Sequence, residues 1–348
     1  MKKHANIPVF IPHLGCPNQC VFCNQRSISG VQEFSEEGLV SEIEAALSTV
    51  AEGIDVEIAF FGGSFTGIDR NLMVSLLKTA HSYIERGRVS AIRCSTRPDY
   101  IDEEVISILK KYGVRTVELG LQSVSDSVLT ACKRGHTRAD ELRACRMIVE
   151  SGLDLVGQMM IGLPGSTPEC EIETAEFIAN VGAVGARIYP TVVFRETELS
   201  FMTDSGEYSP LALYDAVKRT AAAYKVLMSA GVEVIRIGLC ASENLTSNDS
   251  YHAGPNHPAI GELVENEIYY DLICEKLPTR EAILGKRLKI EVARGESSKA
   301  IGQKRANIAR LCKDFGLFSV KVAENCALNP HEITVFITER ENNVLKDT

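Results

Sequence analysis

Short apolar segments alternate with longer amphipathic ones along most of the chain. Brief apolar runs rich in β-branched residues predict strands, whereas apolar positions three and four residues apart predict helices. Strands are expected over residues 9–14, 56–61, 91–95, 116–121, 154–162 and 186–193. Helices are expected over residues 36–51, 69–86, 102–112, 125–132, 138–151 and 168–181.

Consecutive strand-then-helix units predict parallel strands joined by right-handed crossovers. The regular pattern stops short of the eight units of a complete barrel. We therefore expect an α/β fold, a partial (β/α)6 TIM-like barrel. A longer helix (210–230) and a further strand (232–240) follow it, and then a loop bearing Gly, Pro and His at 250–263.

The pattern changes near the C-terminus. Residues 279–348 read as a strand, two helical pieces around a tight turn, and two more strands. This order predicts a small α+β domain of its own. We expect one domain over residues 1–278, comprising the barrel, its extension and a lid loop, and a second over residues 279–348.

Composition limits the classes of protein that need be considered. No apolar run of the 348 residues approaches the ~18 needed to span a membrane, and no secretory signal is evident, so we expect a cytoplasmic protein. The net charge of −9 argues against nucleic acid, but residues 286–313 hold 9 Lys and Arg against 2 Asp and Glu. This basic segment favours phosphate contacts.

Three of the 11 cysteines are clustered as C-x3-C-x2-C at Cys16, Cys20 and Cys23, directly after the first predicted strand. A structural zinc site would need a fourth ligand, for which His13 is near enough. A [4Fe–4S] cluster with one iron left open explains three ligands directly.

This spacing, with Phe22 before the last cysteine, resembles the radical S-adenosylmethionine (SAM) superfamily. The resemblance implies that SAM chelates the open iron. It also implies that the reduced cluster, fed by an external donor such as flavodoxin or ferredoxin, cleaves SAM to methionine and a 5′-deoxyadenosyl radical. In such enzymes the protein supplies placement and exclusion of water.

Glycines and polar residues follow the other predicted strands, where active sites of parallel barrels lie. The segment "FFGGSFTG" resembles the Gly-Gly-Glu motif that binds the SAM amino group, with serine in place of glutamate. Polar residues within apolar strands need partners, which a ligand can supply. The candidate cofactor-binding residues are Gly62, Gly63, Ser64, Ser95, Gln122, Arg134, Gln158 and Arg187.

Several longer motifs resemble the radical SAM domain of the Elongator catalytic subunit and its bacterial relatives. They are "TRPDYID", "ELGLQS", "KRGHT", "IGLPGST", "RIYPTVVFRETEL" and "YHAGPNHPAIGEL", and the resemblance covers residues 7–265. A weaker resemblance is to oxygen-independent coproporphyrinogen III oxidase. Residues 279–348 are too few for the acetyltransferase domain of Elongator, so acetyl transfer is not expected.

The C-terminal segment resembles a KH RNA-binding domain. Its tight turn is Gly302-Gln303-Lys304-Arg305, with arginine where the KH turn has its second glycine. A KH turn clamps the backbone of single-stranded nucleic acid. Gly302, Lys304 and Arg305 are therefore the candidate RNA-binding residues, and a solvated basic helix is the alternative.

The residues that act on the substrate are not identified by any motif. Side chains able to relay a hydrogen atom or contact the substrate are Tyr189, Cys240, Tyr251, His252 and His257. Our first hypothesis is a radical SAM enzyme that modifies RNA (tRNA or rRNA). The alternatives are radical chemistry on a small molecule such as a tetrapyrrole, and a metal-stabilised RNA-binding protein without catalysis.

Overall fold

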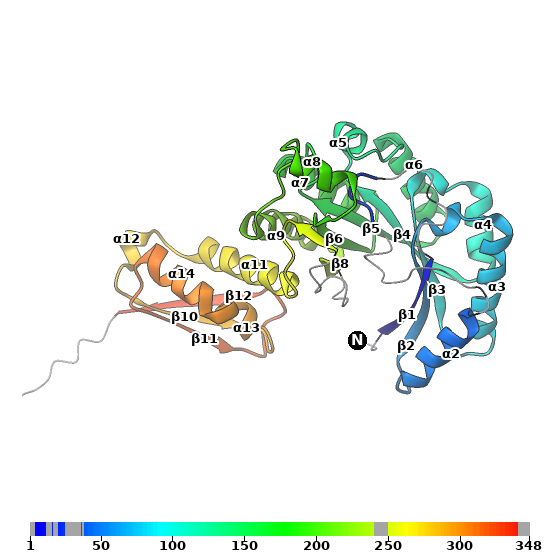
Figure 1. The fold of residues 1–348 in the computed structure, drawn as a ribbon. Helices are drawn as coiled ribbons and strands as arrows, with labels where there is room; N and C mark the ends of the chain where they lie inside the picture. The colour runs from blue at the N-terminus through cyan, green and yellow to red at the C-terminus, as the bar shows by residue number, and fades with distance from the viewer. Residues whose placement is uncertain are drawn as a thin grey trace, which may run out of the picture. The chain divides into compact units, whose positions relative to one another are not determined.

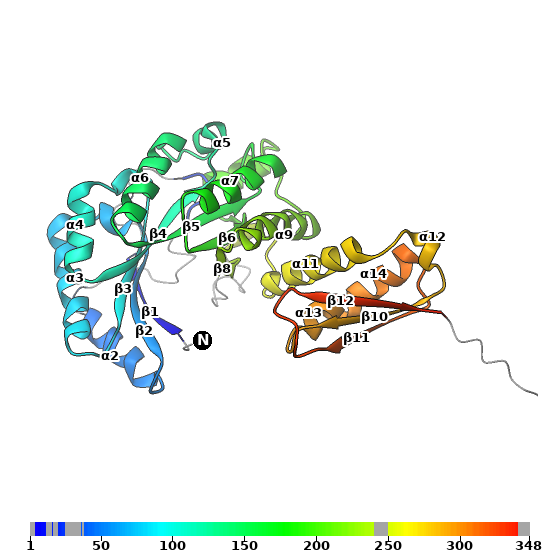
Figure 2. The same ribbon diagram turned by 180° about the vertical axis from the view of Figure 1, so that it is seen from behind.

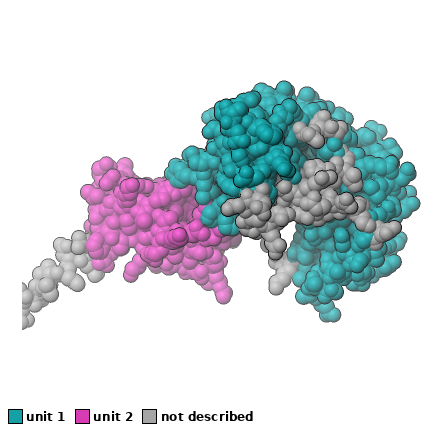
Figure 3. Space-filling model, in the orientation of Figure 1, with its two compact units in different colours: residues 1–258 teal, residues 259–348 magenta. Residues whose placement is uncertain are grey.

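The computed structural model describes residues 4–11, 16, 20–24, 36, 38–239 and 250–339 of the chain. The chain divides into two compact units, residues 1–258 and residues 259–348, shown in different colours in Figure 3.

Seven parallel strands form the sheet of the first unit, in the order β1-β2-β3-β4-β5-β6-β8 (Figure 1). They are β1 (His4–Ile11), β2 (Asp55–Gly62), β3 (Ala91–Thr96), β4 (Val114–Gln122), β5 (Asp154–Ile161), β6 (Gly185–Pro190) and β8 (Glu233–Ile237). The sheet curls into a partial barrel. A short antiparallel pair, β7 (Val193–Phe194) and β9 (Tyr251–Ala253), lies apart from this sheet.

Helices cover the outer side of the curled sheet (Figures 1 and 2). They are α2 (Leu39–Thr49), α3 (Arg70–Glu85), α4 (Glu103–Lys111), α6 (Arg138–Glu150), α7 (Pro168–Asn180) and α9 (Leu213–Ser229), with single 3-10 turns η1 (Phe65–Gly67) and η2 (Pro98–Tyr100). The shorter helices α5 (Asp126–Ala131) and α8 (Glu198–Asp204) lie at the carboxyl ends of the strands. Helix α3 shows why these segments are helical. The Asp69 carboxylate accepts hydrogen bonds from the first-turn N–H groups of Asn71 and Leu72, and the residues that α3 buries recur at helical spacing.

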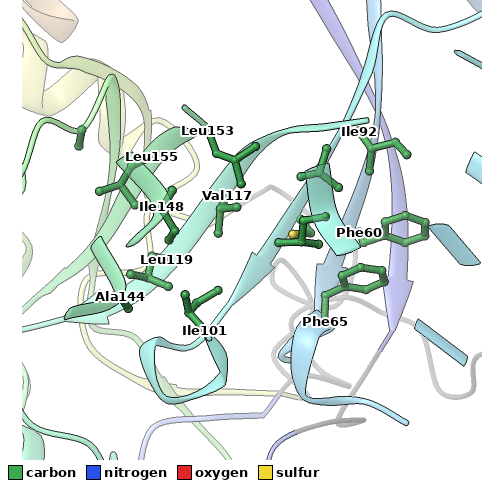
Figure 4. Close-up of a cluster of buried hydrophobic side chains, with 14 of the residues drawn as sticks. Phe60, Phe65, Ile92, Ile101, Val117, Leu119, Ala144, Ile148, Leu153 and Leu155 are labelled. Carbon is green, nitrogen blue, oxygen red and sulfur yellow. The ribbon is translucent and has the colours of Figure 1, made fainter. Parts of the chain in front are cut away.

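The core of the first unit lies between the sheet and these helices, as Figure 4 shows. Phe60 of β2 stacks on Phe65 of η1, with ring centroids 4.5 Å apart. Leu119 of β4 and Leu155 of β5 are buried together with Ile148 of α6. Apolar faces on both layers therefore hold each helix to its strand.

The predicted α/β partial barrel is confirmed, with one strand more than the six regular units. The segment expected as a further strand forms β8 and pairs in parallel with β6. Strand β1 runs from His4 to Ile11, earlier than the predicted residues 9–14. Proline tends to end a strand, but Pro8 lies in an edge strand, where a missing N–H is tolerated.

The second unit packs helices against one face of a three-stranded sheet (Figure 2). Its helices are α11 (Ile260–Lys276), α12 (Arg280–Ile283), α13 (Ser297–Ile301) and α14 (Ala306–Phe315), with the 3-10 turn η3 (Gln303–Arg305), and its strands are β10 (Arg287–Val292), β11 (Ser319–Glu324) and β12 (Ile333–Thr338). The sheet order is β11-β10-β12, with β10 parallel to β11 and antiparallel to β12. The order expected around the turn, strand-helix-helix-strand, is present.

The compact units divide one helix earlier than the predicted domain boundary at 278/279. The structure divides the chain after Pro258, because Tyr269 and Ile273 of α11 are buried in the same cluster as Leu288 and Ile290 of β10. This helix is acidic, so the whole unit holds 14 Lys and Arg and 14 Asp and Glu.

Among the helices that the structure describes, none combines the length and the apolar character required to cross a membrane.

Candidate cofactor site at the carboxyl ends of the strands

A cavity of about 610 Å³ lies in the first unit where the sheet strands end. It brings together most of the cofactor and metal candidates that the sequence indicates. These are Cys16, Cys20, Cys23, Gly62, Gly63, Ser64, Ser95, Gln122, Arg134 and Gln158. Residues separated by more than 130 positions in the chain thus line one cavity.

The cysteine segment is held in place by backbone contacts to other elements. Val21 N–H donates to the Cys132 carbonyl at 3.3 Å, and the Val21 carbonyl accepts from Leu199 N–H at 2.8 Å. Cys23 N–H donates to the Cys20 carbonyl at 3.0 Å, which closes a turn between two of the three thiols. None of the ten described cysteines forms a disulfide, so these thiols are available as metal ligands.

Two buried arginines face the Cys20 sulfur. Arg134 Nη1 lies 3.3 Å from Cys20 Sγ and Arg97 Nη1 lies 3.8 Å from it. Arg97 also donates to the Arg134 carbonyl and makes two hydrogen bonds of 2.9 Å to the Asp99 carboxylate. Burial by itself would raise the pKa of Asp99, but the hydrogen bonds and charge of Arg97 hold that pKa below its usual value. The two guanidinium groups therefore provide positive charge where a thiolate would be negative.

Gln122 carries two signs of a ligand-binding position. Its φ is 73°, a left-handed conformation that is uncommon for residues other than glycine. Its Oε1 is buried and has no hydrogen-bond partner among the described residues. Buried polar atoms are nearly always paired, so this side-chain amide oxygen is suited to accept a hydrogen bond from a bound molecule.

Gly62 ends β2 at the point where β1 also ends. Its φ is 108°, and a Cβ at this position would lie 3.1 Å from both the backbone nitrogen and oxygen of Ile11. Only glycine fits there. The next residue, Gly63, lines the cavity, and Ser64 Oγ lies 3.4 Å from Cys16 Sγ. The predicted glycine turn thus places exposed backbone beside the first cysteine.

A buried network of charges surrounds Glu118 on β4. Arg187 Nε and Nη2 donate to its two oxygens at 2.7 and 2.9 Å, Arg93 Nη1 donates at 2.9 Å, and Gln158 Nε2 donates at 2.9 Å. Burial by itself would raise the pKa of Glu118, but Arg187 and Arg93 hold that pKa below its usual value. Arg93 continues the network to Glu57 at 2.6 Å, so the pairs join β2 to β6.

This network changes the interpretation of Arg187. The sequence indicates Arg187 as a cofactor contact, but the structure places its guanidinium on Glu118 and over the Phe61 ring, and Arg187 is not among the residues lining the cavity. Gln158 belongs to both regions, since it lines the cavity and donates to Glu118.

The substrate candidates are not brought together at the cavity. Tyr251 donates from its hydroxyl to the Gly254 carbonyl at 2.9 Å, and His252 Nε2 lies 2.9 Å from an Asp204 oxygen on α8. Tyr189 and His257 are partly buried, and neither lines the cavity. Cys240 and His13 lie outside the described residues.

Three further residues that line the cavity, Asn24, Glu196 and Glu198, are not among the candidates that the sequence indicates. Glu196 has a φ of 59°, and Glu198 is paired with Lys133. Both carboxylates lie in the motif "RIYPTVVFRETEL". Their position after the sixth strand is the signal that would have identified them.

Behind the arginines lies a buried His–Glu pair. His136 Nε2 is 3.1 Å from Glu141 Oε1. Burial lowers the pKa of His136 to about 3 and raises the pKa of Glu141 to about 9. Both groups are therefore uncharged at neutral pH, and one proton is shared in the hydrogen bond between them.

Comparison with known proteins gives consistent matches. Residues 10–178 match the radical SAM superfamily, and residues 183–270 match the Radical_SAM C-terminal domain. The chain is 29% identical over 248 residues to the tRNA uridine(34) acetyltransferase of Methanocaldococcus jannaschii, covering 58% of this chain and 45% of that protein. It is 26% identical over 310 residues to human Elongator complex protein 3, covering 80% of this chain and 55% of that protein.

Among solved structures, the fold is similar to that of the archaeal Methanocaldococcus infernus Elp3. The TM-score is 0.63 at 23% identity, covering 85% of this chain and 68% of the other. The chain spans about half the length of the curated relatives that it matches. The resemblance stated from the motifs is confirmed for the radical SAM domain, whereas the KH-like domain stays a prediction. The chain belongs to the radical SAM superfamily and is homologous to the radical SAM regions of Elongator complex protein 3 and its archaeal relatives.

Proposed function

We propose that the chain is a radical SAM enzyme in which Cys16, Cys20 and Cys23 hold a [4Fe–4S] cluster and the adjoining cavity binds SAM. The observation that carries the proposal is that all three cysteines line one cavity together with Gly62, Gly63 and Gln122. When bound and reduced by an external flavodoxin- or ferredoxin-like donor, the cluster supplies the electron that cleaves SAM.

The residues present fit these two groups. Three thiols are a donor set typical of iron–sulfur ligation. The guanidinium groups of Arg134 and Arg97 offset negative charge at Cys20, and the buried Gln122 side-chain oxygen is available to accept a hydrogen bond. The backbone at Gly62 and Gly63 lets a ligand approach closely.

The test is anaerobic purification, iron analysis and incubation with SAM and dithionite. We expect iron and sulfide in the protein, and release of 5′-deoxyadenosine and methionine. The Cys20→Ser variant is expected to lose the iron and the products, whereas Cys326→Ser, an exposed cysteine in the second unit, is expected to keep both. Zinc in place of iron in the anaerobically purified protein would contradict the proposal.

We further propose that the substrate is RNA. Support comes from relatives whose names state tRNA modification and from the second unit, where the turn at residues 302–305 presents two exposed cations, Lys304 and Arg305. Gly302 has a φ of 78°, and a Cβ there would lie 2.9 Å from Asn307 N, so the chain at this turn requires glycine.

The RNA proposal is tested by adding RNA to the SAM cleavage assay and by comparing modified nucleosides with and without the gene. We expect RNA to stimulate cleavage and one modified nucleoside to disappear when the gene is deleted. An unchanged nucleoside profile would contradict an RNA substrate while leaving the radical chemistry in place.

A further inference from the structure

The three-stranded sheet of the second unit has one face covered by helices and one open face. Alternate residues of β10 show this: Leu288, Ile290 and Val292 are buried, whereas Lys289 between them is exposed. On β12, Phe336 is exposed, and on β11, Lys321 is exposed. These outward residues define the open sheet face.

Strand register aligns the open sheet face into rows. Lys289 is paired with Phe336 on one side and with Lys321 on the other, so one row reads Phe336-Lys289-Lys321 across all three strands. The next row contains Arg287, whose guanidinium lies 5.5 Å from the ring centroid of Phe318, just before β11. Neighbouring strands are about 4.8 Å apart, so cations and aromatic rings lie at close spacing.

Both aromatic rings are unusually exposed for phenylalanine. Phe318 is 48% exposed and Phe336 is 44% exposed. Each ring has a cation over it, Arg287 over Phe318 and Lys289 over Phe336, both at 5.5 Å. An exposed cation–π contact is weaker than the stacking of a nucleic-acid base on an aromatic ring, so a base can compete for each ring face.

The charges on this face leave a positive excess. Lys289 is paired with Glu291 at 2.7 Å, and Lys286 is paired with Glu339 at 2.8 Å. Arg287 and Lys321 add two further cations to the same face. Elsewhere in the unit, the basic residues of the helices are partly neutralised, since Arg310 is paired with Glu267 and Lys299 with Glu296.

We propose that the open sheet face binds single-stranded RNA, with bases stacked on Phe318 and Phe336 and phosphates held by Arg287, Lys289 and Lys321. Exposed aromatic rings with cations beside them are the combination by which proteins bind single strands without reading their sequence. The choice of RNA over DNA rests on the proposed function. The face is separate from the Lys304-Arg305 turn, because that turn lies between the helices α13 and α14, on the covered side of the sheet.

The test is fluorescence anisotropy of the full chain with a labelled 12-nucleotide single-stranded RNA of mixed sequence, at two salt concentrations. We expect the Phe318→Ala/Phe336→Ala variant to bind RNA at least about tenfold more weakly. The Lys321→Ala variant is expected to lower the slope of log affinity against log salt concentration by about one. Phe201→Ala is the matched control, because Phe201 is 67% exposed on α8 of the first unit. The same RNA annealed into a duplex is expected to bind more weakly, since its bases are already stacked.

Binding of the double Phe variant within twofold of the wild-type value would overturn the proposal, and so would absence of binding by the wild-type chain. Self-association that the double variant abolishes would assign the face to a second copy of the chain instead. RNA that stimulates SAM cleavage equally in both proteins would overturn this inference and leave the proposed function standing. RNA that binds through the two rings without stimulating SAM cleavage would support this inference and contradict the proposed RNA substrate.

Discussion

The cysteine-lined cavity of the first unit and the open sheet face of the second use basic side chains in opposite ways. At the cavity, Arg97 and Arg134 are about 95% buried and contact a carboxylate, a carbonyl or a sulfur. On the sheet face, Arg287 and Lys289 lie over exposed rings. A buried charge needs fixed partners, whereas an exposed one adapts at little cost. The first arrangement suits a bound cofactor in one geometry, and the second suits a flexible chain.

The largest effect is expected from the charge network beneath the cavity. Glu118→Gln leaves the buried charges of Arg93 and Arg187 without their shared carboxylate, so we expect a loss of about 3–5 kcal/mol in the free energy of unfolding. Urea denaturation measures it, with Glu104→Gln, at a side chain 71% exposed, as the control. If both variants unfold at the same urea concentration, the stability of the barrel does not depend on this charge network.

The next effect concerns the electrostatics at Cys20. Arg134→Met removes a positive charge 3.3 Å from the sulfur, so a bound cluster should become harder to reduce, by up to about 1.5–3 kcal/mol, on the order of 100 mV. Redox titration followed by electron paramagnetic resonance, without SAM, measures the midpoint potential. Arg143→Met, at a side chain 52% exposed, is the control. A midpoint potential equal to that of the wild type would show that Arg134 does not act on the cluster.

The buried His136–Glu141 pair predicts a pH dependence of stability. The pKa of Glu141 is raised from 4.5 to about 9, so the folded state keeps a proton that the unfolded state releases. The stability that this proton provides is full below pH 4.5 and is lost as pH rises toward 9.

Between pH 7 and pH 9 the Glu141→Gln variant should therefore lose less stability than the wild type, by up to about 1.4 kcal/mol per pH unit. His136 contributes little in this window, because it is uncharged in the folded state and only a minority of unfolded molecules carry its charge at pH 7 and above. Thermal unfolding at several pH values measures the slope, with Glu150→Gln on the same helix as the control. Parallel slopes for the two variants would mean that Glu141 is ionised in the folded protein.

The smallest effect is expected at the turn of the second unit. Lys304→Glu/Arg305→Glu reverses two exposed charges, so we expect RNA affinity to fall several-fold at low salt and the loss to shrink as salt is added. Filter binding at several salt concentrations measures it, with Lys313→Glu, an exposed lysine on α14, as the control. An effect no larger than that of the control would leave the sheet face as the RNA contact of the unit.

Sequence alone predicted the parts of the molecule that local patterns determine. Strand-then-helix alternation predicted the partial barrel, and cysteine spacing together with strand-end position predicted most of the cavity lining. Sequence patterns did not predict the side-chain contacts that depend on strand register. Arg187 and Glu118 are 69 positions apart, and only the pairing of β4, β5 and β6 shows that they meet.

The same limit applies to the second unit. Phe336 and Lys289 become neighbours only through the antiparallel pairing of β10 with β12. The compact units divide before α11 because this helix contributes to a core formed by strands that follow it in the chain. Burial of Tyr269 by residues up to 64 positions later cannot be inferred from helical periodicity alone.

The central claim is that the three clustered cysteines and the cavity beside them form a SAM-cleaving site. The most direct measurement is the amount of 5′-deoxyadenosine that the full chain releases from SAM under anaerobic, reducing conditions, compared with the Cys16→Ala/Cys20→Ala/Cys23→Ala variant. We predict release by the wild-type chain and none by the variant. Release of no 5′-deoxyadenosine by iron-loaded wild-type protein, or equal release by both proteins, would contradict it.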